Sequence, residues 1–109
     1  QIWLIFMNKN TVFKFSEEDI IKNLKKIDGW FLKEDLTSIS KTFIFKDFKV
    51  AFSWMTSISI EAEKLNHHPE WANVYNKIEI KLSTHDVLGL SKKDFLMAIY
   101  MDQEFMKVK

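Results

Sequence analysis

The chain has 109 residues, of which 47% are hydrophobic, and a formal net charge of +1, so it can form one domain with an apolar core and lacks a strongly polarised surface. All 16 basic residues are lysine, and without the paired donors of arginine a nucleic-acid-binding role is not expected. The chain has no cysteine and only 2 glycines, which excludes a thiolate nucleophile, sulfur-ligated zinc and a glycine-rich phosphate loop.

Residues 1–15 are an apolar N-terminal extension whose role the sequence leaves open. They include the apolar run from Ile2 to Met7, which is far shorter than the about 20 residues of a membrane-spanning helix. The run also lacks the basic leader and small-residue cleavage site of a signal peptide. An extra strand, a segment covered by a partner and a remnant of a targeting segment remain as alternatives. Residues 16–109 are expected to form one domain.

The first predicted helix begins at Ser16, which is followed three residues later by Asp19, the pattern of a capped N-terminus. Gly29 is expected to end this helix, whose predicted buried side chains are Ile20, Leu24 and Ile27. Two strands joined by a polar stretch predict an antiparallel hairpin over residues 30–32 and 40–45.

A long second helix is predicted from the Asp47 cap to about residue 66. Its apolar residues follow a 3-4-3-4-3 spacing, which predicts one buried stripe made of Phe48, Ala51, Met55, Ile58, Ala62 and Leu65. Four further apolar residues lie off this stripe, namely Val50, Phe52, Trp54 and Ile60. So much apolar surface predicts burial on more than one side, either in a central core helix or in a subunit interface.

Pro69 cannot continue this helix, so His67 and His68 are expected where the chain leaves it and where side chains can face a cleft. A turn is predicted at residues 74–77. The alternation of apolar and polar residues that follows predicts a strand whose buried face is made of Ile78, Ile80 and Leu82.

A last helix is predicted to start at Ser91, which is followed by Asp94 in a second capping pattern, and to run to about residue 106. Its expected apolar face is made of Phe95, Leu96, Ile99 and Tyr100. The elements therefore follow the order helix, strand, strand, helix, strand or hairpin, helix. This order is typical of an α+β domain with an antiparallel sheet covered on one side by helices.

The three histidines, His67, His68 and His85, lie close together in the chain, and histidine is the side chain best suited to moving protons near neutral pH. Adjacent side chains on an extended segment point to opposite sides, so His67 and His68 are not expected to chelate one metal together. A metal site made of His67, His85 and Glu63 stays open, as does a set of polar side chains satisfied by backbone groups. The third alternative is metal-free general acid–base catalysis, in which one imidazole removes a proton and another protonates a leaving group.

An ordered set of motifs surrounds these histidines: Glu63-Lys64-Leu65-Asn66-His67-His68-Pro69-Glu70-Trp71, Val74-Tyr75-Asn76-Lys77, Leu82-Ser83-Thr84-His85-Asp86, and Gly89-Leu90-Ser91 with Asp94. Together with Gly29-Trp30 and Phe45-Lys46-Asp47-Phe48, this set closely resembles the pterin-4a-carbinolamine dehydratase family, the 4a-hydroxytetrahydrobiopterin dehydratases. The resemblance covers roughly residues 16–106, and the histidine motifs are its specific part.

The resemblance implies an α-β-β-α-β-β-α fold, with a four-stranded antiparallel sheet and three helices packed on one face. It implies a hydro-lyase that dehydrates 4a-hydroxytetrahydrobiopterin to quinonoid dihydrobiopterin without metal or cofactor, a step that recycles the pterin used by aromatic amino acid hydroxylases. It also implies a homodimer or homotetramer joined through the long helix at residues 47–66, which would account for Val50 and Trp54 lying off the core stripe. A cytoplasmic location is expected, with a nuclear one and targeting by residues 1–15 left open, and neither nucleic acid nor membrane is an expected partner.

The active-site histidines of the family fall on His67, His68 and His85, and its substrate contacts fall on residues 66–68 and 83–85. We expect His67 and His85 to exchange the protons while His68 orients the pterin. The other expected substrate contacts are Glu63, Asn66, Pro69, Trp71, Ser83 and Thr84. The expected supporting residues are Asp94 and Trp30, with ordinary core packing as the alternative for both tryptophans.

Two departures from the family pattern stand out. Asn66 occupies a position that is often acidic in animal members, which removes a negative charge beside the histidines, and residues 1–15 have no matching counterpart. Some vertebrate members also serve as dimerisation cofactors of a homeodomain transcription factor, but no motif for that role is found in this sequence. The alternative to a dehydratase is a non-enzymatic dimerisation or binding module on the same fold.

Overall fold

Helices and strands follow one another in an order that confirms the predicted α+β class. The computed structural model describes residues 12–109, and within them the elements are α2 (Glu17–Leu24), β1 (Phe31–Leu32), β2 (Ile39–Ile44), α3 (Phe48–Leu65), β3 (Glu70–Val74), β4 (Lys77–Leu82), the 3₁₀ turn η1 (His85–Val87) and α4 (Lys92–Val108). Of the predicted N-terminal extension, residues 1–11 lie outside the described part of the chain, and its role stays a prediction.

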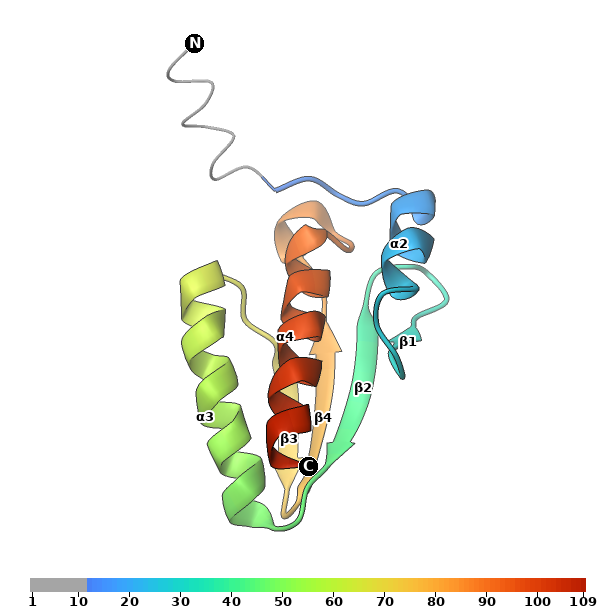
Figure 1. The fold of residues 1–109 in the computed structure, drawn as a ribbon. Coiled ribbons are helices and arrows are strands. Elements are labelled where there is room, and N and C mark those ends of the chain that lie inside the picture. The colour runs from blue at the N-terminus through green and yellow to red at the C-terminus, as the bar shows by residue number, and fades with distance from the viewer. Residues whose placement is uncertain (1–11) are drawn as a thin grey trace.

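The four strands form one antiparallel sheet in the order β1-β2-β4-β3. In the central pair, Ile39 of β2 is aligned with Leu82 of β4, and Phe43 with Ile78. All four of these side chains are buried in the core that the sheet shares with the helices. Figure 1 shows α3 and α4 side by side across β3 and β4, with α2 beside the start of β2.

The β3–β4 hairpin is fixed to the segment between β2 and α3 by one asparagine. Tyr75 and Asn76 form the connection between the strands. The Asn76 side-chain amide donates to the Phe45 carbonyl at 2.9 Å, and the Phe45 backbone N–H donates to the Asn76 carbonyl at 2.8 Å. The predicted turn is therefore confirmed, and it belongs to the end of the sheet opposite the end of α3.

The capping residues predicted from the sequence start the helices in the structure. Ser16 accepts a hydrogen bond from the backbone N–H of Asp19 at 3.1 Å, and the Asp19 carboxylate accepts one in return from the Ser16 backbone. The Asp47 carboxylate accepts from the backbone N–H of Val50 at 2.9 Å and starts α3. At its other end α2 stops at Leu24, earlier than predicted.

The buried face of α3 differs from the predicted stripe. The buried residues are Ala51, Trp54, Ile58 and Ala62, whereas Phe48 is half exposed and Met55 only partly buried. The Trp54 indole packs against the rings of Phe43 and Phe45, and its N–H donates to the Met101 carbonyl at 3.3 Å. The expectation that Trp54 lies off the core was wrong, because this indole fills the space between the sheet and α4. Val50 is partly buried against the same core.

The apolar face of α4 was also predicted only in part. Phe95 is buried as expected, but Leu96 is exposed, while Ile99 and Tyr100 are only partly buried. The buried residues of the helix are Asp94, Phe95, Met97, Ala98 and Met101. The burial of Asp94 at the start of this helix is the feature that bears most on function.

Trp30 belongs to a polar contact that ties the start of β1 to α4. Gly29 has a φ of +79°, a conformation that suits glycine, and turns the chain into the strand. The Trp30 indole N–H donates to one Asp102 oxygen at 3.0 Å, and the Lys41 ammonium donates to the other at 2.8 Å. The Trp30 ring also packs edge-on against Phe43. Core packing, the alternative left open for this tryptophan, is what the structure has.

Candidate active site

The end of α3, the end of β4 and the start of α4 meet at one end of the fold (Figure 1). Asn66 follows α3 with a φ of 52°, in the left-handed region that asparagine tolerates better than most side chains. The backbone N–H groups of Asn66 and His67 both bond back to the last turn of the helix. The chain therefore leaves α3 abruptly, and the two following histidines have different surroundings.

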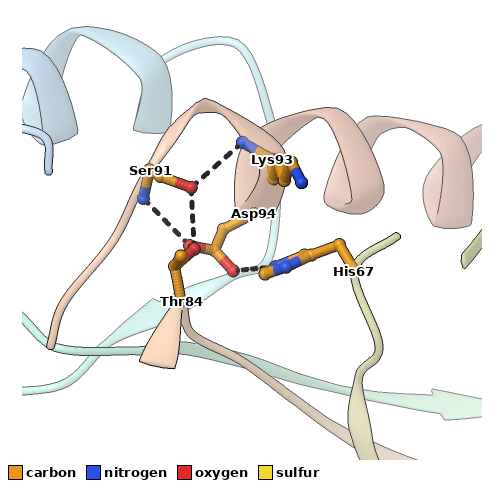
Figure 2. Close-up of polar contacts among 5 residues, drawn as sticks. All are labelled: His67, Thr84, Ser91, Lys93 and Asp94. Carbon is orange, nitrogen blue, oxygen red and sulfur yellow. Dashed lines mark hydrogen bonds and ion pairs between the residues drawn. The ribbon is translucent and has the colours of Figure 1, made fainter. Parts of the chain in front are cut away.

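His67 turns inward and pairs with Asp94. Its ring nitrogen Nε2 lies 2.6 Å from Asp94 Oδ1, and only 8% of the His67 surface is exposed. Figure 2 shows Asp94 between His67 on one side and the pair Thr84 and Ser91 on the other. The second carboxylate oxygen accepts from the Thr84 hydroxyl at 2.7 Å and from the Ser91 backbone N–H at 2.9 Å. Asp94 is fully buried, and its hydrogen bonds replace the water that it has lost.

This hydrogen-bond pattern determines which nitrogen of His67 is available. An ionised carboxylate only accepts hydrogen bonds, so Nε2 of His67 donates to Asp94 and carries a proton. Among the described residues Nδ1 has no hydrogen-bond partner, and no buried side-chain nitrogen or oxygen is left without one. His67 lines a cleft, and Nδ1 is the ring nitrogen that the bond to Asp94 leaves available there. In the neutral ring this nitrogen holds a lone pair that can accept a proton.

His68 points away from the core and pairs with a different carboxylate. Its Nε2 lies 2.6 Å from Glu63 Oε2, across the last turn of α3, and both side chains are largely exposed. An exposed pair of this kind contributes on the order of 0–1 kcal/mol to stability. Its main effect is to restrict the orientation of the His68 ring.

His85 lies in η1, directly after the buried Thr84. The Thr84 backbone exchanges hydrogen bonds with Gly89, which closes a short loop and holds His85 at the surface. Thr84 itself is not free to contact a ligand through its hydroxyl proton, because that proton is donated to Asp94. Its hydroxyl oxygen lies 2.7 Å from Ser91 Oγ, which completes the buried network.

A cleft of about 260 Å³ brings the three histidines together, and its full lining is Val12, Asn66, His67, His68, Ser83, Thr84, His85, Asp86 and Lys93. We call it the histidine cleft. Of the predicted site residues that do not line it, Glu63 reaches its edge through the bond to His68, and Pro69 follows as the residue that directs the chain into β3. Trp30 is in the core, and Trp71 borders a separate shallow hollow of about 600 Å³ on the open face of the sheet.

Three residues of the cleft were not predicted from the sequence: Val12, Asp86 and Lys93. The last two had a usable signal, because Asp86 adjoins His85 and Lys93 adjoins Asp94 in the chain. Lys93 also donates through its backbone N–H to Ser91 Oγ (Figure 2). Its position in the first turn of α4 brings a cation to the cleft.

Among residues 12–109, no group of three or more histidine, aspartate or glutamate side chains is arranged to hold a metal ion. In the same range, no helix is long and apolar enough to cross a bilayer.

Comparison with known proteins relates this chain to one protein family. Residues 13–104 match the family model described as pterin 4 alpha carbinolamine dehydratase. A protein of Sinorhizobium fredii that carries this family's name is 53% identical over 90 residues, which are 83% of this chain and 86% of the relative. A pterin-4-alpha-carbinolamine dehydratase of Drosophila melanogaster is 45% identical over 96 residues, which are 86% of this chain and 50% of the relative.

The same likeness extends to three dimensions. A crystal structure described as a transcriptional coactivator/pterin dehydratase from Brucella melitensis superposes with a TM-score of 0.81 at 37% sequence identity. The match covers 84% of this chain and 98% of the Brucella chain.

Proposed function

The chain belongs to the pterin 4 alpha carbinolamine dehydratase family, and from this premise we propose that it dehydrates 4a-hydroxytetrahydrobiopterin to quinonoid dihydrobiopterin. The coarse activity, a hydro-lyase acting on a pterin carbinolamine, is that of the family. The observation that carries the finer proposal is the buried His67–Asp94 pair, whose free ring nitrogen faces a cleft shared with His68 and His85.

The reaction needs one base and one acid. The substrate has a hydroxyl group on C4a and a hydrogen on the adjacent N5. Removal of the N5 proton lets its electron pair form a C4a=N5 double bond, while the C4a–O bond breaks and the hydroxide takes up a proton to leave as water. Each proton transfer by a positioned side chain typically contributes about 10²–10⁴-fold to the rate.

We assign the base to Nδ1 of His67. The lone pair of this nitrogen is directed away from Asp94, because Nε2 holds the other position as a donor. When Nδ1 takes up the N5 proton, the ring becomes a cation next to the buried carboxylate, which stabilises that charge. The bonds from Thr84 and Ser91 keep the carboxylate in place throughout the reaction.

We assign the acid to His85 and a binding role to His68. His85 is exposed and lines the cleft from η1, which follows β4, whereas His67 and His68 come from the end of α3. This arrangement supports proton delivery to the C4a hydroxyl from the side across the pterin from His67. His68, which is bonded to Glu63, is oriented to contact the ring. Asn66, Ser83 and the backbone of Thr84 supply polar groups for the ring edges.

In this scheme the protein needs neither metal nor organic cofactor. The reaction changes no oxidation state, and the two proton transfers are within the capacity of imidazole side chains. The corresponding test is dehydratase activity after dialysis against a chelator, together with elemental analysis of the purified protein. We expect full activity with no stoichiometric metal. Activity that is lost on chelation and restored by one metal would contradict this part of the proposal.

The experiment that tests the function itself is stopped-flow dehydration of freshly generated 4a-hydroxytetrahydrobiopterin, followed by the absorbance of the quinonoid product. The protein is expected to accelerate product formation well above the spontaneous rate, in proportion to its concentration. A folded protein that leaves the spontaneous rate unchanged would instead favour a non-enzymatic binding module on the same fold. Pterin recycling would follow from the activity, and the cytoplasmic location stays a prediction.

We further propose that the chain assembles as a homodimer or homotetramer through the exposed side of α3. Phe52 and Ile60 are 54% and 56% exposed, and the Phe48 and Phe52 rings contact one another beside a hollow of about 440 Å³. Apolar surface of this kind commonly marks an interface. Phe52→Asp is expected to reduce the mass measured by light scattering to that of the monomer, whereas Lys22→Asp, which lies on α2 and outside that hollow, leaves the assembly intact. An unchanged mass in Phe52→Asp would contradict an interface there.

A further inference from the structure

One wall of the histidine cleft comes from the segment that precedes α2. This segment, residues 12–15, leads into the Ser16 cap of the helix, and we call it the N-terminal strap. Its first residue, Val12, is partly buried and lines the cleft, although the other lining residues begin only at Asn66. The family model matches from residue 13 onwards, so Val12 lies outside the matched part of the chain. The proton chemistry described above does not use it.

Phe15 attaches the N-terminal strap to the start of α4. Its backbone N–H donates to the Leu90 carbonyl at 2.8 Å. Its ring stacks on the buried Phe95 ring, with the two centroids 5.7 Å apart. Figure 1 shows the strap, in blue, passing the start of α4 on its way to α2. This end of the strap is therefore held by a hydrogen bond and by apolar packing.

Lys14 connects the strap to the loop that carries His85. The stem of its side chain lies over Gly89, where an added Cβ would be only 2.9 Å from Lys14 Cε. Gly89 in turn exchanges backbone hydrogen bonds with Thr84, the residue before His85. Val12 is two residues from Lys14, and two residues of chain span at most about 7 Å. The contact on this loop therefore keeps Val12 close to it.

Apolar surface is scarce in the histidine cleft. Among the described residues that line it, Val12 alone has a wholly hydrocarbon side chain, and the others carry imidazole, amide, hydroxyl, carboxylate or ammonium groups. Trp30 and Trp71 do not line the cleft. Small-molecule sites commonly combine a few polar groups with apolar side chains that cover the rest of the ligand. In this cleft the apolar part of that lining is supplied by Val12.

We propose that Val12 is a substrate-binding residue, which packs its two methyl groups against the bicyclic ring of the pterin. The polar residues of the cleft bind the ring edges and move the protons, whereas Val12 removes part of the ring surface from water. The contacts of Lys14 and Phe15 hold the strap in the position that this role needs. This inference rests on the proposed dehydratase function, and it adds a residue of the strap to the same site.

The test measures the dehydration of 4a-hydroxytetrahydrobiopterin by Val12→Ala, together with its inhibition by biopterin, which has no hydroxyl on C4a and cannot be dehydrated. Removal of the two methyl groups should raise KM and the inhibition constant by roughly 3- to 10-fold. The value of kcat should stay within about twofold of the wild type, because a contact made equally before and during the reaction affects binding alone.

Phe13→Ala is the matched control. Phe13 follows Val12 in the strap, but it is 69% exposed and lies outside the cleft. The control removes a larger apolar side chain from the same segment, and it should leave KM and the inhibition constant unchanged. Thermal unfolding followed by circular dichroism shows that each variant is folded.

The outcomes separate this inference from the function on which it rests. A rise of both constants in Val12→Ala, but not in Phe13→Ala, supports the contact. A wild type that dehydrates the substrate, with constants that Val12→Ala leaves unchanged, overturns the contact and leaves the dehydratase in place. Equal rises in the two variants, or a loss of kcat alone in Val12→Ala, also overturn it. A wild type that neither dehydrates the substrate nor binds biopterin overturns both.

Discussion

Replacement of Asp94 by asparagine changes the protonation of His67 while leaving the shape of the site nearly intact. Asparagine has one acceptor and one donor where aspartate has two acceptors. The Ser91 backbone N–H is a fixed donor that faces Asp94 Oδ2, so the amide oxygen must take that position. The amide NH₂ then faces Nε2 of His67, which must become the acceptor. The ring proton moves to Nδ1, and the nitrogen that faces the histidine cleft loses its lone pair.

The size of the effect follows from the role of the base. Loss of a correctly oriented general base lowers kcat by roughly 10²–10⁴-fold, a range that includes the loss caused by a wrong histidine tautomer in other enzymes. The effect on folding is smaller, because the amide oxygen still accepts from Ser91 and Thr84. Loss of the charge-assisted bond to His67 costs about 1.5–3 kcal/mol. A domain of this size loses roughly 4–8 °C in Tm for each kcal/mol.

The assay is stopped-flow dehydration of the 4a-carbinolamine, with thermal unfolding followed by circular dichroism. Asp19→Asn is the matched control, because Asp19 occupies the same position in the capping pattern of α2 but is exposed and remote from the cleft. The control should keep full kcat with a small change in Tm. An Asp94→Asn protein that is folded and keeps kcat within about threefold of the wild type would refute the assignment of His67 as a base held by Asp94.

Substitutions at four further residues test other parts of the molecule. His85→Ala should lower kcat by roughly 10²-fold or more with stability within about 0.5 kcal/mol of the wild type, since its side chain is exposed, whereas His68→Ala should mainly raise KM. A larger kcat loss in His68→Ala would reverse the two roles. Asn66→Ala should cost about 1–2 kcal/mol of unfolding free energy because of its φ of 52°, and Asn66→Gly should cost less; equal stability of the two would contradict strain at this position. Trp54→Phe should cost about 1–3 kcal/mol, measured by denaturant unfolding, because the indole N–H bond to the Met101 carbonyl is lost and the smaller ring leaves space in the core; a change in oligomer mass without a change in stability would place Trp54 at an interface instead.

Local signals predicted the starts of the helices well. Each capping side chain accepts a hydrogen bond from a backbone N–H only a few residues away, so the pattern can be recognised without knowledge of the rest of the fold. The caps are Ser16 with Asp19, Asp47, and Ser91 with Asp94. The strand at residues 77–82 was predicted for the same reason, because its alternation reflects one buried face.

The orientation of the helices was less predictable, and α3 shows why. Apolar residues occur around most of its circumference, so two overlapping stripes are compatible with the sequence, and both contain Ala51, Ile58 and Ala62. Only the position of the sheet decides between them, and it selects the stripe that includes Trp54. A helix with apolar residues on several sides does not itself specify which side packs inward.

The residues of the candidate site were also predictable from the sequence only in part. The motifs around His67, His68 and His85 identified the histidines, and all three do line one cleft. The contact between His67 and Asp94 spans 27 positions in the chain and depends on how α4 packs at the end of α3, so no local pattern predicts it. The bond from the Thr84 hydroxyl to Asp94 spans 10 positions and is likewise absent from any local pattern, while Thr84 as a substrate contact stays a prediction.

The measurement that tests the central claim most directly is the single-turnover rate of 4a-carbinolamine dehydration by the double variant His67→Ala/His85→Ala, compared with the wild type. If the two imidazoles exchange the protons, the wild type accelerates the reaction and the folded double variant falls to the spontaneous rate. Residual activity close to that of the wild type in a double variant with native circular dichroism would contradict histidine acid–base catalysis at this cleft.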